Sequence, residues 1–130
     1  MAEVTIEGRD TYTIYDDQSI GKVDIADEVV AIIAGIAAME VDGVSSMAGN
    51  ATRELISKLG MKTLSKGVKV DVLEGIVTVT LALNLKFGSN IKETTMAVQE
   101  KVKAAIENMT GLTVADVNIR VAGVEMPVEE

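Results

Sequence analysis

Few side chains of this chain are of a type that does chemistry. It contains no His and no Cys, so the commonest general base and the usual ligands of structural zinc are missing. The neighbouring serines Ser45 and Ser46 have no adjacent residue that would activate them as nucleophiles, although a lysine partner stays open. We therefore expect a protein that is not an enzyme and has no catalytic residues.

Two groups of acids are candidates for binding Mg²⁺ or Ca²⁺. They are Asp16–Asp17 and the set Asp24, Asp27 and Glu28. Neither has the spacing of an EF-hand loop, and the start of a helix explains the second set, because the helix dipole favours acids there. No G-x-G-x-x-G or P-loop pattern follows a predicted strand. The sequence thus predicts no metal and no cofactor.

The charge balance narrows the range of partners. The 130 residues carry a net charge of −8, from 20 acids against 12 bases, whereas binding to DNA or RNA draws on clustered Lys and Arg. No apolar run reaches the roughly 18 residues of a membrane span, and no signal peptide opens the sequence. We expect no nucleic-acid partner, no direct membrane insertion and a cytoplasmic location.

The hydrophobic pattern predicts a single α+β domain over residues 20–126, after a variable N-terminal segment 1–19 with a short strand or hairpin and before a tail 127–130. The predicted order is helix (24–40, with Asp24 as N-cap), strand (44–47), helix (52–60), strand, strand, helix (91–109) and strand. A hairpin turning at Glu74–Gly75 sets Val72 opposite Val77, Val70 opposite Val79 and Val68 opposite Leu81. The crossover through the long helix makes the last strand parallel to 76–85. We expect a small mixed sheet with helices packed mainly on one face.

The first predicted helix is apolar on every side. A bulky stripe should face the core and consists of Ile25, Val29, Ile32, Ile33 and Ile36. The opposite side, where a half-buried helix is normally polar, carries the small residues Ala31, Ala34, Gly35 and Ala38. Either another element of the same domain covers this small strip, or the strip is a surface for self-association or for a partner.

A second candidate surface lies on the polar face of the predicted sheet. It consists of Lys69, Thr78, Thr80 and Arg120, which alternate with the apolar positions of their strands. Such residues are also ordinary solvated strand positions. Together with the small strip, they make up our candidate interaction surface.

Several blocks of the sequence resemble the alkaline shock protein family, the envelope stress response proteins of Gram-positive bacteria. The blocks are "IGKVDIADEVVAIIAGIAAMEVDGV" (20–44), "KGVKVDV" (66–72), "FGSNIKE" (87–93) and "VQEKVKAAIENMTGLTVADVNIRVAGV" (98–124). They follow one another in the family's order, and the resemblance covers roughly residues 20–126.

The resemblance implies a cytoplasmic, non-catalytic protein of the cell-envelope or alkaline stress response, and some members are held near the membrane by a separate anchoring protein. We expect an interaction or scaffold protein that forms a homo-oligomer or docks on a membrane-anchored partner. The alternative is a small regulatory module that binds a metabolic enzyme or a small ligand linked to lipid or cell-wall metabolism. A deep, enclosed pocket beside the sheet would favour this alternative.

Overall fold

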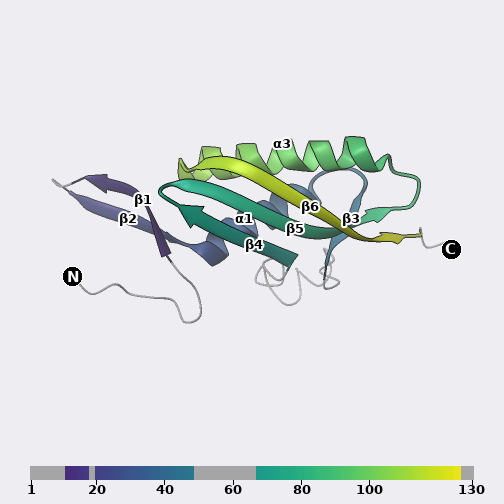
Figure 1. The fold of residues 1–130 in the computed structure, drawn as a ribbon, viewed down its shortest axis with the longest axis horizontal. Coiled ribbons are helices and arrows are strands. Elements are labelled where there is room, and N and C mark those ends of the chain that lie inside the picture. Colours follow the sequence, from purple (N-terminus) through teal and green to yellow (C-terminus); the bar gives the residue numbers. More distant parts are fainter. Residues whose placement is uncertain (1–10, 18–19, 49–66, 127–130) are drawn as a thin grey trace.

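The computed structural model describes residues 11–17, 20–48 and 67–126 (Figure 1). The elements are β1 (Thr11–Asp17), β2 (Gly21–Ala26), α1 (Asp27–Met39), β3 (Val44–Met47), β4 (Val68–Leu73), β5 (Ile76–Lys86), α3 (Ile91–Thr110) and β6 (Thr113–Glu125). The helix that we predicted at 52–60 lies outside the described residues. For the rest of the domain the predicted order of elements is confirmed.

The main sheet is built around β5. Along one edge β5 pairs with β6 in parallel, and along the other edge it pairs antiparallel first with β4 and then with β3. The hairpin register is the predicted one, with Val72 opposite Val77 and Val70 opposite Val79. The parallel pairing of β6 after the crossover is confirmed as well, so the sheet is mixed.

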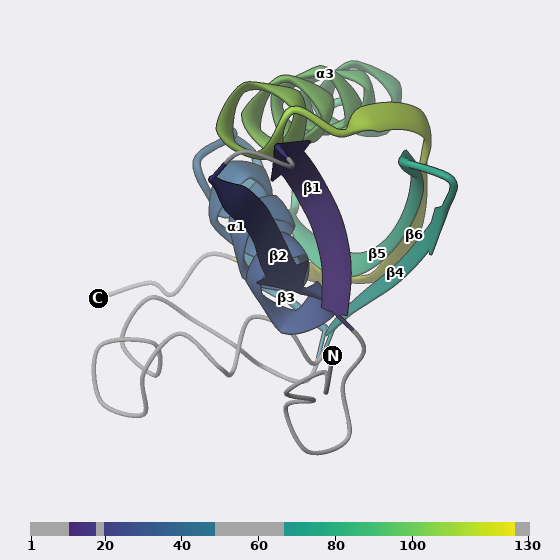
Figure 2. The ribbon, with the colours of Figure 1, turned by 90° about the vertical axis from the view of Figure 1, so that its left-hand side faces the viewer.

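Helices α1 and α3 cover the same face of this sheet, as Figure 2 shows end-on. They pack against each other and against the strands. Between them lies an aliphatic core, to which β5 contributes alternate buried residues and α3 a stripe with a spacing of four residues: Val77, Val79, Leu81, Leu83, Leu85, Val98, Val102 and Ile106. The predicted fold class, α+β with helices mainly on one face, is therefore confirmed.

The long helix α3 begins and ends where the sequence predicted. Asn90 accepts a hydrogen bond of 3.0 Å from the backbone N–H of Glu93, and Gly111 follows the helix with φ 76°, the left-handed conformation that glycine adopts without steric cost. Ile91 and Met109, which the pattern also assigns to the buried stripe, are 52% and 69% exposed. The residues of α3 that are buried follow another line along the helix, from Thr94 to Thr110.

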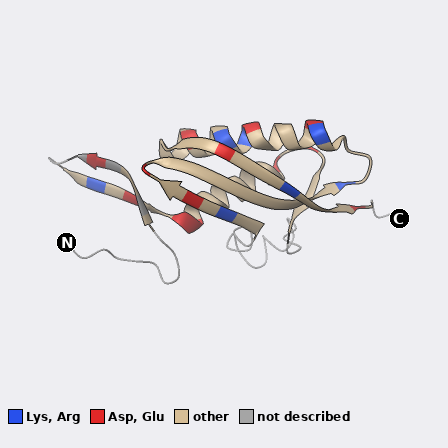
Figure 3. Cartoon of the chain, in the orientation of Figure 1, with Lys and Arg blue, Asp and Glu red and all other residues tan. Residues whose placement is uncertain are grey.

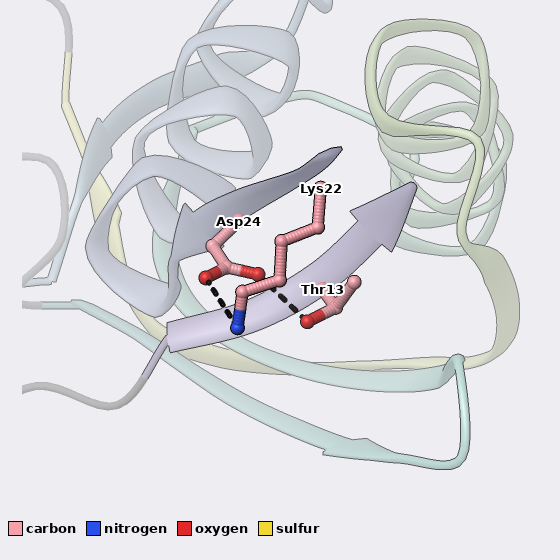
Figure 4. Close-up of polar contacts among 3 residues, drawn as sticks. All are labelled: Thr13, Lys22 and Asp24. Carbon is pink, nitrogen blue, oxygen red and sulfur yellow. Dashed lines mark hydrogen bonds and ion pairs between the residues drawn. The ribbon is translucent and has the colours of Figure 1, made fainter. Parts of the chain in front are cut away.

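The N-terminal part of the structure is a two-stranded arm that pairs β1 with β2 and projects beyond one end of the main sheet (Figure 1). The prediction that Asp24 caps the first helix was wrong, because Asp24 lies in β2 and the N-cap position is Ala26. Asp24 instead accepts a hydrogen bond of 2.7 Å from Thr13 Oγ1 and lies 3.5 Å from Lys22 Nζ (Figure 4). The Thr13 hydrogen bond, supported by the charge of Lys22, lowers the pKa of Asp24.

Candidate interaction surfaces

The small strip of α1 is buried inside the domain. Ala31, Ala34 and Ala38 are each 0% exposed, and Gly35 is buried beside them. Helix α1 contacts α3, β3, β4 and β5, and short side chains let these neighbours approach the helix axis closely. Elements of the same chain therefore cover this strip, as the first of the two alternatives predicted. The second alternative, in which these four residues form an exposed partner surface, was wrong.

Three bulky residues lie on the side of α1 opposite the small strip and are less buried than it, whereas Val30, Ile33 and Met39 are buried. Val29 is 44% exposed, and Ile32 and Ile36 are partly exposed. Val29, Ile32 and Ile36 are spaced by three and four residues, which places them on one face of the helix, and Ile25 in β2 precedes them. We call these four residues the α1 stripe. The prediction that the bulky residues face the core holds in part: Ile25, Ile32 and Ile36 are partly buried and pack against the core, and Ile33 is 8% exposed, whereas Val29 is 44% exposed.

The arm extends the α1 stripe beyond the helix. Val23 is 51% exposed and precedes Ile25 by two residues, so both side chains lie on the same face of β2. Lys22 and Asp24 alternate with them on the other face, where Asp24 accepts a hydrogen bond from Thr13 and forms an ion pair with Lys22 (Figure 4). The arm thus has one polar face and one apolar face, and the apolar face leads into the α1 stripe.

The second set of predicted residues comes together on the outer face of the sheet, away from the helices. Lys69 pairs with Thr80, and Arg120 pairs with Ala82, the next outward position of β5. Lys69, Thr80 and Arg120 line a hollow of about 500 Å³ whose other walls include Ala48 and Gly67. Thr78 lies on the same face but outside the hollow.

This hollow differs from the pocket that would favour a ligand-binding module. It is open to solvent on the sheet surface rather than deep and enclosed. Lys and Arg residues of the described elements alternate with Asp and Glu and do not gather into one basic patch (Figure 3).

A polar cluster that sequence reasoning missed joins β3 to β6 across β5. Glu125 accepts hydrogen bonds from Ser45 Oγ and, at 2.8 Å, from Ser46 Oγ, and Asn84 Nδ2 donates to Ser46 Oγ at 3.0 Å. The serine hydroxyls lower the pKa of Glu125, which makes this carboxylate a weaker base. The cluster therefore suits holding strands together better than activating a nucleophile. Ser45 and Glu125 are 80 positions apart, so no local pattern could reveal the contact.

Among the described residues, no group of three or more His, Cys, Asp or Glu side chains could hold a metal ion. No helix within the same residues has both the length and the apolar character needed to cross a membrane.

These features define the class: a small α+β protein with a polar outer sheet face and an apolar stripe along one helix. The family model described as "ASP23 family, cell envelope-related function" matches residues 15–126. The chain belongs to this family, whose function is related to the cell envelope, and the resemblance to alkaline shock proteins is thereby confirmed.

The curated relatives that match are themselves uncharacterised. YqhY of Bacillus subtilis is 39% identical over 111 residues, which cover 85% of this chain and 82% of YqhY. YloU of Bacillus subtilis is 33% identical over 108 residues, with 82% and 90% covered. Spy1535 of Streptococcus pyogenes is 32% identical over 106 residues, with 81% and 80% covered.

Among solved structures, a variant of MamM CTD matches with a TM-score of 0.48 at 13% sequence identity. The match covers 76% of this chain and 98% of that one. A likeness of this size supports no argument about fold or function.

Proposed function

We propose that this chain is a non-catalytic interaction protein of the cell-envelope stress response, and that it docks on a protein partner through the α1 stripe. The observation that carries the proposal is the inverted burial of α1. Its small residues are buried within the domain, while Val29 is 44% exposed and Ile32 and Ile36 are partly exposed. A helix that is apolar on both sides has a second surface to bury.

The spacing of the α1 stripe suits a particular kind of partner. Val29, Ile32 and Ile36 are three and four positions apart in α1, the spacing of the anchors with which a helix fits an apolar groove. Completing the burial of these partly exposed side chains contributes about 2–4 kcal/mol in total. This free energy is enough to favour a specific contact with a partner. It is too small to force the isolated chain to aggregate.

The partner proposed here is anchored in the membrane, and the chain works on the cytoplasmic side. With a net charge of −8, the chain is repelled by an anionic bilayer surface. An anchored protein would overcome this repulsion, and the apolar face of the arm beside Val23 would enlarge the contact. Self-association of the chain would present several α1 stripes to the same membrane.

A regulatory module that binds a small anionic ligand is the second candidate. The hollow between Lys69 and Arg120 supports it, since its volume of about 500 Å³ falls in the range of ligand pockets. Its openness ranks it below docking through α1. An Arg120→Gln variant that loses a citrate-induced rise in melting temperature, while Lys101→Gln keeps it, would promote this candidate.

The docking proposal is tested by placing an acid in the α1 stripe. In cells that produce the protein, we expect wild type in the membrane fraction and Ile32→Glu released from it. Met109→Glu is the matched control, because Met109 is an exposed apolar residue at the end of α3. Circular dichroism melting shows whether each variant is folded. Equal distribution of all three proteins would overturn the proposal.

A further inference from the structure

The free edges of β6 and β4 differ in whether side chains bond to their unpaired backbone groups. On the free side of β6, Gln99 Nε2 of α3 donates to the backbone oxygen of Val117 at 3.0 Å, and Glu107 of α3 accepts from the backbone N–H of Val114 at 2.9 Å. These side chains occupy the groups with which another strand would pair. No hydrogen bond of the described residues covers the free side of β4 in this way.

The hairpin geometry identifies which backbone groups of β4 face its free side. Glu74 and Gly75 have φ values of 52° and 78°, as in the two-residue turn that makes the flanking residues, Leu73 and Ile76, exchange hydrogen bonds. Because these bonds alternate along an antiparallel pair, the backbone groups of Lys69 and Asp71 also face β5. The N–H and C=O groups of Val68, Val70 and Val72 therefore face outward.

We propose that β4 pairs antiparallel with β4 of a second copy, around a two-fold axis at Val70. The inference deepens the proposed function, because it assigns the self-association of an interaction protein to one surface. In this register Val70 faces its own copy and Val68 faces Val72 of the second copy. The backbone N–H and C=O groups of Val68, Val70 and Val72 in each copy then have hydrogen-bond partners in the other copy. The two sheets join into one continuous sheet.

The side chains on the outer face make this register self-complementary. Lys69 lies opposite Asp71 of the second copy, and by symmetry Asp71 lies opposite its Lys69. In the part of the chain that the structure describes, neither residue forms an ion pair. Leu73, which is 76% exposed, comes opposite Gly67, a position without a side chain. Opposite charges at directly paired positions stabilise a sheet.

The neighbouring registers are disfavoured by the same charges. A two-fold axis at position 69 sets Lys69 against Lys69, and one at position 71 sets Asp71 against Asp71. Registers shifted by one residue would place the valines of the second copy on the outer face of the first sheet. A lysine on an edge strand discourages pairing with unrelated strands, and here only the Val70-centred register neutralises it. Cyclic two-fold dimers of this type are the commonest oligomers.

A charge-swap series tests the proposal by sedimentation equilibrium at low salt. Lys69→Asp and Asp71→Lys each replace two attractive pairs by two repulsive ones, so we expect each to raise the dimer dissociation constant about tenfold or more. The double variant restores complementarity and should return to within about threefold of wild type. An equimolar mixture of the two single variants should form a heterodimer. Lys103→Asp, on α3, is the matched control and should leave the constant unchanged.

Amide hydrogen exchange gives a second readout that does not depend on charge. Raising the protein concentration should slow exchange at Val68, Val70 and Val72 and leave Lys69 and Asp71 unchanged, since those two already pair with β5. A wild type that stays monomeric at millimolar concentration would overturn the proposal, as would a double variant no better than the single ones. Ile32→Glu should dimerise normally. Loss of the β4 dimer can therefore be distinguished from loss of docking through the α1 stripe.

Discussion

Glu125, at the end of β6, accepts a hydrogen bond of 2.8 Å from Ser46 Oγ on β3, and the central strand β5 lies between the two. Ser46 is 0% exposed, and a buried hydroxyl without a partner is costly. The contact therefore holds the short strand β3, which pairs with β5 at only a few positions, against the rest of the sheet.

We predict that Glu125→Gln destabilises the protein by about 1 kcal/mol at neutral pH. The hydroxyl donors lower the pKa of Glu125 in the folded state, so their contribution is complete above the unfolded pKa and is lost as the pH falls through the folded pKa. The difference between wild type and variant should therefore shrink in acid. Urea unfolding at neutral pH and well below the ordinary Glu pKa of about 4.3 checks this. A difference that stays constant, or that matches Glu100→Gln on α3, would contradict it.

Removing the protection of the β6 edge should expose a specific amide. We expect Glu107→Ala to cost about 1 kcal/mol, because the backbone N–H of Val114 loses its acceptor at 2.9 Å. Hydrogen exchange at Val114 should become faster, while exchange at residues of β4 stays unchanged. Glu100→Ala, on the exposed side of the same helix, is the control and should alter neither quantity.

Enlarging the small strip of α1 should destabilise the fold rather than change its assembly. Ala34 is 0% exposed, so Ala34→Leu overpacks the core and should cost about 1–3 kcal/mol. Ala122→Leu, at an exposed position of β6, should stay within about 0.5 kcal/mol of wild type. Thermal unfolding measures both. A stable Ala34→Leu variant with an altered molar mass would restore the strip as a contact surface.

The β4–β5 turn contains a residue that is suboptimal for its conformation. Glu74 has φ 52°, a region that Asn tolerates better than other residues with a side chain. Glu74→Asn should therefore stabilise the protein by about 0.5–1 kcal/mol, whereas Glu74→Ala should give no gain. Melting temperatures of the three proteins decide this, and an unchanged value for Glu74→Asn would contradict it.

Much of the fold followed from local patterns. The alternation on both sides of Glu74–Gly75 fixed the register of β4 and β5, because a two-residue turn leaves one way of pairing strands whose apolar residues share a face. The start of α3 followed from Asn90 and its end from Gly111. The family followed from blocks of sequence that keep their order.

The candidate site followed only in part. The sequence identified α1 as a helix with two apolar sides but left open whether the domain covers the small strip, and it did not reveal the contact of Glu125 with Ser45 and Ser46. The outer-face residues Lys69, Thr80 and Arg120 were placed correctly, because charged and apolar residues alternate along their strands.

By itself, the sequence determined which face of an element is buried wherever polar and apolar residues lie on opposite faces. Only the tertiary structure decided the orientation of α1, where that contrast is absent. There the choice depends on packing: Ala31, Ala34 and Ala38 are fully buried beside Val30 and Ile33, while Val29 is left exposed. Such a choice depends on the shape of a cavity formed by distant segments, which no local spacing encodes.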